Sequence, residues 1–487
     1  MQTVVIDDEE IAHAAFRCAY PAFASTAGLD KLRARDYARL DRDGHVYLDF
    51  TGAGLPAASH VAAHMALLTD GVFGNPHARN PTSLAASALV EHARARVLAF
   101  FNAAPDEYEV IFTPNATGAL RVVGESYPFA PGGSLLLTYD NHNSVNGIRE
   151  FARAAGAGID YVPLSTPDLR VDTTALEAAW ARARAGADNL FAYPAQSNFS
   201  GVQHPLDWIA EAHAHGWDVL LDAAAFTPTN RLDLRAVKPD FVDVSFYKMF
   251  GYPTGAGCLI ARKRALRKLR RPWFGGGTIV FSSVGGDGHR LLSGAAGFED
   301  GTVNFLGLPA VTLGLDYLES AGIDAIHTRV TCLSAWLLGR LLAVRHRNGR
   351  PAVRLYGPRG TDRRGATIEL NLLDADGQLW DCEAVARLAG EQRISLRAGC
   401  HCNPGAREIA LGYSAAELRR CFDDRAGASL EDFQRAIAGK TTGALRVSLG
   451  LITTFGDVFR FARFVESFTD RRAQALREPS PPSDKPA

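Results

Sequence analysis

The sequence predicts an α/β protein: a large domain with a mainly parallel sheet flanked by helices, followed by a smaller C-terminal α+β domain. From about Gly44 to Pro272, short apolar runs alternate with longer amphipathic stretches, which is typical of a parallel sheet covered by helices on both faces. After Leu306 the pattern changes to a long helical stretch and a few separated strands. A chain of 487 residues is long enough for two or three domains at about 150 residues each.

We expect four segments along the chain. Residues 1–43 form an N-terminal arm with a helix over Leu29–Leu40, and we assign this arm to the small domain. Residues 44–306 form the large, ligand-binding domain, and residues 307–476 form the small domain. Residues 477–487 are rich in proline and polar side chains, so we expect a disordered tail there.

The elements follow from the apolar pattern. The expected strands of the large domain are Glu109–Phe112, Ser134–Tyr139, Ile159–Pro163, Leu190–Tyr193, Asp218–Leu221, Phe241–Val244 and Gly257–Ala261. Its expected helices include Ser83–Ala103, Val145–Ala155, Thr173–Arg184 and Pro205–His215. The small domain is expected to contain a long helical segment over Pro309–Val344, the strands Ala366–Leu373, Ile394–Ala398 and Leu445–Ser448, and a last helix over Phe455–Phe468 capped by Thr453 or Thr454.

Composition excludes several classes of protein. The 52 Lys and Arg residues balance the 53 Asp and Glu residues, so we expect no general affinity for nucleic acid or for anionic membranes. No stretch approaches the roughly 18 uncharged apolar residues of a membrane span, and the acidic start of the chain does not resemble a secretory signal. Seven scattered cysteines do not form a disulfide framework, so we expect reduced thiols in a cytoplasmic protein.

The loops that follow the predicted strands carry the candidate site residues, because open α/β sheets bind ligands at the carboxyl ends of their strands. Ala116 and Thr117 begin a helix, where free N–H groups can bind an anion, although a threonine there can also be a simple helix cap. His142 can stack on a planar ligand or move protons, or lie exposed in a turn. Asn198 belongs to a loop rich in neutral hydrogen-bonding side chains.

Two charged residues complete the pattern. Asp222 closes an apolar strand, where a carboxylate needs a partner such as a cationic ring nitrogen, a helix cap or a salt bridge. Lys248 follows the strand Phe241–Val244, where it can lose its proton and form a Schiff base with an aldehyde, or lie along the surface. A phosphate, a flat ring, a basic nitrogen and an aldehyde are together the features of pyridoxal 5'-phosphate (PLP). The usual nicotinamide and P-loop glycine motifs do not occur.

The chain resembles the class V aminotransferase-fold enzymes of PLP fold type I, the group that contains cysteine desulfurases. Within that group it is most similar to the desulfurase domain of the molybdenum cofactor sulfurases. The resemblance covers roughly residues 45–465, and the strings that carry it are GNPHARNPTS from Gly74, NHNSV from Asn141, YPAQSNFSG from Tyr193, LDAAAF from Leu221, SFYKMFGYPTG from Ser245, FEDGT from Phe298, LRAGCHCNPGA from Leu396 and LRVSLG from Leu445.

The resemblance implies how a cofactor would be held. Lys248 would carry PLP as a Schiff base and then act as the general base at the substrate Cα. Asp222 would pair with the ring nitrogen, His142 would stack on the ring, and Asn198 would contact the ring hydroxyl. In the family the position three residues after the aspartate is often Gln or His, whereas here it is Ala225, so we expect different contacts to the ring hydroxyl.

The resemblance also implies an assembly and a substrate contact. Ala116, Thr117 and Ser245 would hold the phosphate of PLP, and Thr278 would reach it from a second subunit, which implies a two-fold homodimer. Arg397 would clamp the carboxylate of an amino-acid substrate, a task suited to a bidentate guanidinium.

The triplet Cys400-His401-Cys402 has three interpretations. A metal site lacks partners with the right spacing, so we expect none, and two inert thiols remain an alternative. As a sulfur acceptor the triplet is chemically sound, because Arg397 and His401 would provide a positive neighbourhood that raises the thiolate fraction. Cys402 occupies the position of the family's persulfide-carrying cysteine, with Cys400 as a helper or resolving thiol.

The sequence therefore predicts a PLP-dependent cysteine desulfurase-like sulfurtransferase that converts L-cysteine to alanine and an enzyme persulfide. The alternative is a PLP-dependent C–S lyase or aminotransferase acting on another amino acid in a biosynthetic pathway. The complete eukaryotic members of the family continue into a domain that binds the molybdenum cofactor, and this sequence stops at Ala487. We therefore expect the sulfur acceptor to be absent or to be a separate protein.

Overall fold

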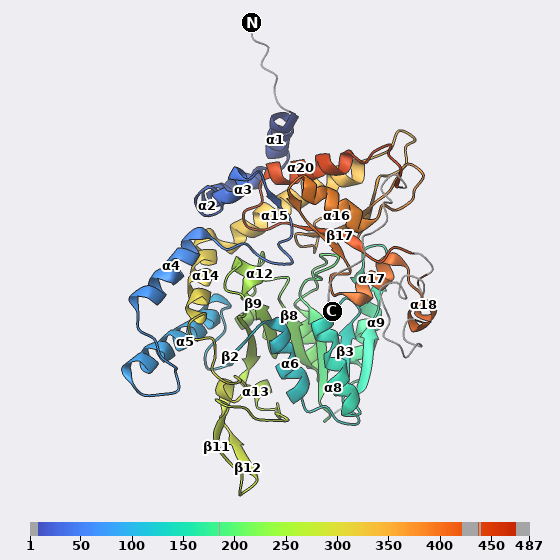
Figure 1. The fold of residues 1–487 in the computed structure, drawn as a ribbon. Helices are drawn as coiled ribbons and strands as arrows, with labels where there is room; N and C mark the ends of the chain where they lie inside the picture. The colour runs from blue at the N-terminus through green and yellow to red at the C-terminus, as the bar shows by residue number, and fades with distance from the viewer. Residues whose placement is uncertain (1–7, 185, 421–436, 438–439, 474–487) are drawn as a thin grey trace.

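A computed structural model describes residues 8–184, 186–420, 437 and 440–473 (Figure 1). A seven-stranded sheet lies at the centre of the large domain, in the order β2-β10-β9-β8-β7-β3-β4. Its strands are β2 (Tyr108–Thr113), β3 (Ser134–Thr138), β4 (Gly158–Val162), β7 (Asn189–Pro194), β8 (Asp218–Asp222), β9 (Phe241–Ser245) and β10 (Gly257–Arg262). All of them point the same way except β10, which is antiparallel to both of its neighbours. The predicted mainly parallel sheet is confirmed.

Side chains alternate between the two faces of this sheet, as the pleat requires. Leu135 and Leu137 of β3 belong to one apolar cluster, together with residues of α6 and α8. Leu136 lies in the opposite cluster, which includes residues of α5. The helices of this domain are α4 (Ala58–Asp70), α5 (Pro81–Phe100), α6 (Ala116–Ser126), α7 (Asn143–Asn146), α8 (Ile148–Ala154), α9 (Thr173–Trp180), α10 (Trp208–Ala214), α11 (Leu234–Val237), α12 (Phe246–Phe250) and α13 (Lys263–Leu266).

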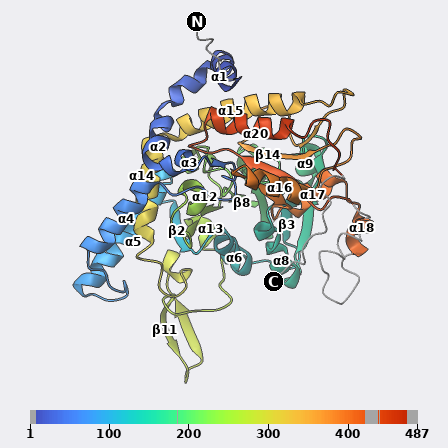
Figure 2. The same cartoon turned by 45° about the horizontal axis from the view of Figure 1, so that its top comes forward.

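The second sheet has four antiparallel strands in the order β13-β14-β17-β16. They are β13 (Val353–Tyr356), β14 (Thr367–Leu372), β16 (Arg397–Gly399) and β17 (Ala444–Ser448). Figure 2 shows α15 and α20 lying side by side above β14. The helices of this part are α14 (Leu308–Ala321), α15 (Ile323–Ala343), α16 (Cys382–Glu391), α17 (Pro404–Leu411), α18 (Ala415–Arg420) and α20 (Phe455–Glu466). A capping box at Thr454 starts α20, as the sequence predicted.

The N-terminal segment packs on the C-terminal part of the chain. It contains α1 (Asp8–Ala19), η1 (Pro21–Thr26), α2 (Gly28–Asp36) and α3 (Ala38–Arg42). The ring of Phe16 lies 4.9 Å from that of Phe455, and Arg33 Nη1 lies 2.6 Å from Asp457 Oδ2. This packing favours the assignment of the arm to the small domain. The domain boundaries at residues 43 and 306 stay predictions, and the tail 477–487 lies outside the described residues.

Some predicted elements are interrupted. The helical segment expected over Pro309–Val344 is two helices, α14 and α15, separated at Gly322, whose φ of +82° is unfavourable for residues with a side chain. The helix expected over Val145–Ala155 is divided at Gly147, because glycine supports a helix poorly.

Two further interruptions come from packing. The helix expected over Leu29–Leu40 is divided at Tyr37, whose side chain is fully buried. The strand expected over Ile394–Ala398 is two short strands. The first, β15 (Ile394–Ser395), pairs with β1 (Val46–Tyr47), while β16 pairs with β17. One segment thus changes partners within a few residues, a tertiary effect that no local pattern encodes.

A hairpin of β11 (Ile279–Ser283) and β12 (Gly288–Leu291), which was not predicted from the sequence, projects from the large domain (Figure 1). Its large apolar side chains Val280, Phe281 and Val284 are exposed. A second small pair, β5 (Leu164–Ser165) and β6 (Arg170–Val171), was also missed. Among the described helices, none has the length and apolar character needed to cross a membrane.

Candidate active site

The carboxyl ends of the parallel strands meet along one edge of the central sheet, and the predicted site residues lie there. Asp222 is the last residue of β8, and Ser245 is the last residue of β9. Lys248 lies in the short helix α12 that follows β9 directly. The strand-end rule therefore brings together residues that are distant in sequence.

The predicted phosphate residues form one cluster at the start of α6. Asn115 caps this helix by accepting a hydrogen bond from Gly118 N at 2.9 Å, and Ser245 Oγ accepts one from Ala116 N at 3.0 Å. Thr117 Oγ1 lies 2.8 Å from Ser144 Oγ. A helix start with hydroxyl groups around it suits a phosphate, so the geometry fits the group that the sequence suggested.

Thr278 does not join this cluster within the chain. It lies immediately before β11, and its hydroxyl bonds with the backbone of Gly275. The prediction placed it in the site of a second subunit, which the single chain leaves untested.

Lys248, Asp222 and His142 lie close enough to act on one another electrostatically. Burial lowers the pKa of Lys248, and the negative charge of Asp222 acts in the opposite direction. Burial also lowers the pKa of His142, aided by the positive charge of Lys248. No described residue forms a hydrogen bond or ion pair with the Lys248 amine. A mostly buried amine whose pKa is lowered is well suited to bond an aldehyde.

Asp222 and His142 are both oriented by neighbouring backbone. Asp222 is 8% exposed, and its carboxylate accepts a hydrogen bond from Ala224 N at 3.0 Å. His142 caps α7, because its Nδ1 accepts a hydrogen bond from Ser144 N at 3.1 Å. A buried carboxylate needs a positively charged partner, and a protonated ring nitrogen would be one. These residues therefore also fit PLP.

Asn198 contacts the cysteine loop rather than standing free. Its Nδ2 donates to the backbone oxygen of His401 at 2.7 Å, and its Oδ1 accepts from Asn403 Nδ2 at 2.9 Å. Its own backbone oxygen accepts from Arg446 Nη1 at 3.2 Å. A contact to the ring hydroxyl remains a prediction, and the amide already connects the large domain to the cysteine loop.

Two guanidinium groups share the carboxylate of Asp49. Arg397 donates from Nε and Nη2 to Asp49 Oδ2 at 3.0 and 2.7 Å, and its side chain is 49% exposed. Arg446 donates from Nη2 to Asp49 Oδ1 at 3.0 Å, and its side chain is 3% exposed. Arg446 precedes Arg397 among the charges that lower the pKa of Lys248. The structure therefore offers a second, more buried candidate for the substrate carboxylate.

The cysteine triplet lies between β16 and α17. Cys402 is exposed and Cys400 is partly buried. The His401 side chain is fully buried, and its Nε2 lies 2.9 Å from Glu369 Oε1. Burial and the nearby arginines lower the pKa of His401 to about 2, so the expectation that His401 adds positive charge beside the thiols is wrong. Among the cysteines that the structure describes, none forms a disulfide.

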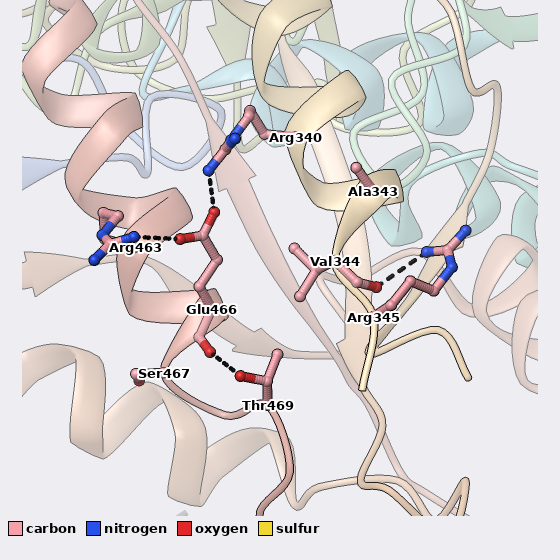
Figure 3. Close-up of a pocket in the computed structure, with 8 residues that line it drawn as sticks. All are labelled: Arg340, Ala343, Val344, Arg345, Arg463, Glu466, Ser467 and Thr469. Atoms are coloured by element: carbon pink, nitrogen blue, oxygen red, sulfur yellow. Dashed lines mark hydrogen bonds and ion pairs between the residues drawn. The ribbon is translucent and has the colours of Figure 1, made fainter. Parts of the chain in front are cut away.

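A small pocket adjoins Lys248. Its lining combines apolar side chains of both domains with hydroxyl and amide groups, and includes Phe50, Thr51, Gln196, Met249, Thr367 and Leu449. Another hollow lies between the ends of α15 and α20 (Figure 3). There Glu466 pairs with both Arg340 and Arg463, and none of the predicted site residues lines it.

Sequence reasoning missed four residues of the site. Asp49 and Arg446 stand in the quoted family region without a stated role, although both are charged residues within apolar stretches. Asp243 is fully buried beside Asp222 in the strand register, and burial and that neighbour raise its pKa well above the usual range. Glu369 alternates with apolar residues in β14, and a charge inside a strand was the available signal.

Comparison with known proteins gives a consistent result. The aminotransferase class-V family model matches residues 46–461. A molybdenum cofactor sulfurase of Solanum lycopersicum is 36% identical over 475 residues, which is 91% of this chain and 57% of that protein. The human molybdenum cofactor sulfurase is 37% identical over 461 residues, 90% of this chain and 51% of that protein. The chain thus spans about half the length of the curated relatives it matches.

Solved structures show the same fold. An apo cysteine desulfurase from Thermococcus onnurineus NA1 superposes with a TM-score of 0.74 at 22% identity, covering 90% of this chain and 97% of that one. The cysteine desulfurase CsdA of Escherichia coli gives a TM-score of 0.70 at 22% identity, covering 90% of this chain and 98% of that one.

Proposed function

Because this chain belongs to the class-V aminotransferase family, we propose that it binds PLP and acts as a cysteine desulfurase-like sulfurtransferase. L-Cysteine would be converted to alanine while Cys402 receives the sulfur. The observation that carries this proposal is the combination of two features: a Lys248 amine near the buried Asp222 that has no hydrogen-bond partner among the described residues, and an exposed Cys402 on a loop bonded to Asn198 of the same sheet edge.

The residues of the proposed site have distinct roles. When bound, PLP would supply an electron sink for bonds at the substrate Cα. The Lys248 amine, whose pKa is lowered by burial, is suited to bond its aldehyde and later to take a proton from the substrate. Asp222 would keep the ring nitrogen protonated, and His142 would lie against the ring. Ala116, Thr117 and Ser245 would hold the phosphate.

The substrate carboxylate would be held by the arginine pair. We infer a contribution from both Arg446 and Arg397, because they flank the single carboxylate of Asp49. One carboxylate between two guanidinium groups leaves a net positive charge, which attracts a second carboxylate. Arg446 is the stronger candidate because its charge is buried and hydrogen-bonded on two sides.

The sulfur step can be written with all atoms accounted for. The thiolate of Cys402 attacks the γ-sulfur of the bound cysteine, so an S–S bond forms and the C–S bond breaks. The electron pair of that bond passes to the substrate carbon, which takes a proton and leaves as alanine. The exposed position of Cys402 then lets an acceptor protein or an added thiol remove the sulfur.

We also propose the two-fold homodimer that the family resemblance implies. The exposed Val280, Phe281 and Val284 on the projecting hairpin support it, since apolar side chains gathered on one projection favour a protein partner. Thr278 lies at the base of the same hairpin.

The test uses the purified protein, PLP and L-cysteine. A yellow protein whose chromophore borohydride fixes to Lys248 would support cofactor binding, and a colourless protein that gains no chromophore with PLP would contradict it. Stoichiometric alanine and a persulfide on Cys402 would support the desulfurase. Turnover of another amino acid without a persulfide would instead favour the C–S lyase or aminotransferase alternative.

A further inference from the structure

The loop that carries Cys402 has an unusual backbone. His401 and Cys402 are consecutive residues with φ of +54° each. For residues with a Cβ, this left-handed conformation costs roughly 1–2 kcal/mol per residue. Two in succession persist only where surrounding contacts hold them, so the contacts of this loop indicate what fixes the thiol.

The side chain of His401 anchors the loop from inside. Its Nε2 lies 2.9 Å from Glu369 Oε1, and both side chains are fully buried. Glu369 lies opposite Arg446 in the sheet register, and Arg446 lies opposite Arg397. Directly opposed residues of antiparallel strands share a face, so the acid that holds the cysteine loop stands in one row with both arginines.

The backbone of the loop is held from the other side by the large domain. Asn143 N donates to the backbone oxygen of Cys402 at 2.7 Å, and Asn198 Nδ2 donates to that of His401 at 2.7 Å. Asn403 Nδ2 donates to the backbone oxygen of Asp140 at 2.7 Å. The imidazole therefore points into the small domain and the carbonyls bond the large domain, while Cys402 stays exposed.

We propose that Glu369 and His401 are positioning residues that hold the Cys402 thiol in a fixed, exposed position for sulfur transfer. This inference rests on the proposed desulfurase function. The buried contact between the two side chains fixes the loop, so the thiol is presented without a rearrangement of the loop. The left-handed backbone of His401 and Cys402 is unfavourable, and it is what turns the imidazole inward and the thiol outward.

The charge state of the pair agrees with a positioning role. Burial raises the pKa of Glu369 well above its usual range, opposed by the positive charge of Arg446. Burial, Arg446 and Arg397 lower the pKa of His401 to about 2. Both directions favour a pair without net charge, joined by the contact of Glu369 Oε1 with His401 Nε2. A neutral pair leaves the charge of the arginines available to the substrate carboxylate, and it supplies no proton to the reaction.

The first test compares Glu369→Met with Glu369→Gln. The amide of Gln can still donate to His401 Nε2, whereas Met fills similar space without a hydrogen bond. Two steps are measured after rapid mixing with L-cysteine: the spectral change of the bound cofactor, which does not need Cys402, and single-turnover release of alanine. Glu369→Met should leave the first within about twofold and slow the second by up to about 10²-fold, since a displacement of 1 Å at a reacting group has effects of that order. Glu369→Gln should behave like the wild type.

A second arm needs no turnover. Iodoacetamide alkylation of Cys402 is followed by mass spectrometry, with the exposed Cys18 as the internal reference. The ratio of the two rates should change in Glu369→Met and in His401→Asn, since asparagine tolerates the left-handed backbone but is too short to keep the bond. It should stay constant in Glu369→Gln and in His213→Leu, which breaks the separate His213–Asp240 pair.

The outcomes separate this inference from the proposed function. If the wild type makes no alanine or persulfide, the desulfurase proposal fails, and the alkylation ratios still test the pair. Should Glu369→Met slow both steps equally, or leave both alanine release and the alkylation ratio unchanged, the positioning role is overturned. If Glu369→Met does not fold, His401→Asn supplies the same comparison.

Discussion

The two arginines that share Asp49 lead to a quantitative prediction about substrate binding. We expect Arg446→Met to lower kcat/KM for L-cysteine about 10²-fold, chiefly by raising KM. Arg446 is buried and has two donor contacts in place. Losing a charge-assisted contact of this kind typically costs about 3 kcal/mol, and each 1.4 kcal/mol corresponds to about a factor of ten.

Arg397→Met is expected to have the smaller effect, within about tenfold, because contacts of half-exposed charges are screened by water. The Arg397 side chain is 49% exposed, and two of its nitrogen atoms already donate to one oxygen of Asp49. The family string assigns the clamp to Arg397, so the two variants discriminate directly between the sequence-based and the geometric assignments.

The assay measures alanine production and the spectral response of the bound cofactor, with L-cysteine and with cysteamine, which lacks the carboxylate. Arg446→Met should respond to the two compounds almost equally, whereas the wild type should prefer L-cysteine strongly. Arg354→Met removes an exposed arginine from β13 of the same sheet and serves as the matched control. A larger loss in Arg397→Met, or an undiminished preference for L-cysteine in Arg446→Met, would refute the reasoning.

The remaining predictions concern the cofactor, the thiols and the assembly. Lys248→Met should remove the borohydride-fixable chromophore. It should also raise the melting temperature of cofactor-free protein at neutral pH, because the folded chain binds the Lys248 proton more weakly than the unfolded chain does. This loss of folding stability shrinks as pH rises toward 10.5, the pKa in the unfolded chain. An unchanged melting temperature across pH would contradict that sign. Cys402→Ala should keep the cofactor and its spectral response to L-cysteine but lose the persulfide and most alanine, whereas Cys400→Ala should be milder; the reverse order would identify the other thiol. Replacing Phe281 and Val284 by Asp should shift light scattering from dimer to monomer, and an active wild-type monomer would exclude the dimer.

Much of the large domain could be predicted because its strands are buried on both faces. Gly257–Ala261 is apolar throughout and Phe241–Val244 is apolar except for Asp243, and both are strands within a residue or two of the expected bounds. The direction of β10 could not be predicted, since a buried strand has the same apolar sequence pattern whether it pairs in parallel or antiparallel. The hairpin β11–β12 was missed because its apolar residues are exposed, which reverses the rule used to find strands.

The site was predictable where one strand end supplies one residue. Lys248, Asp222 and Ser245 follow from that rule and from the family strings. The sharing of Asp49 by Arg397 and Arg446 was not predictable, because it joins residues 348 and 397 positions apart. The inward turn of His401 likewise depends on Glu369 in another strand. A histidine between two cysteines suggests a charged neighbour, and only the tertiary environment shows that it is neutral.

The contact between the N-terminal segment and α20 has a consequence for synthesis of the protein. Arg33 and Asp457 are 424 positions apart, and Phe16 packs on Phe455. Closing such a distant contact is entropically slow, and the N-terminal segment leaves the ribosome long before its partner exists. The central sheet lies wholly between these two segments and can form first. The N-terminal helices must therefore wait with apolar side chains uncovered, and this interval is when the chain is most exposed to aggregation and to chaperones.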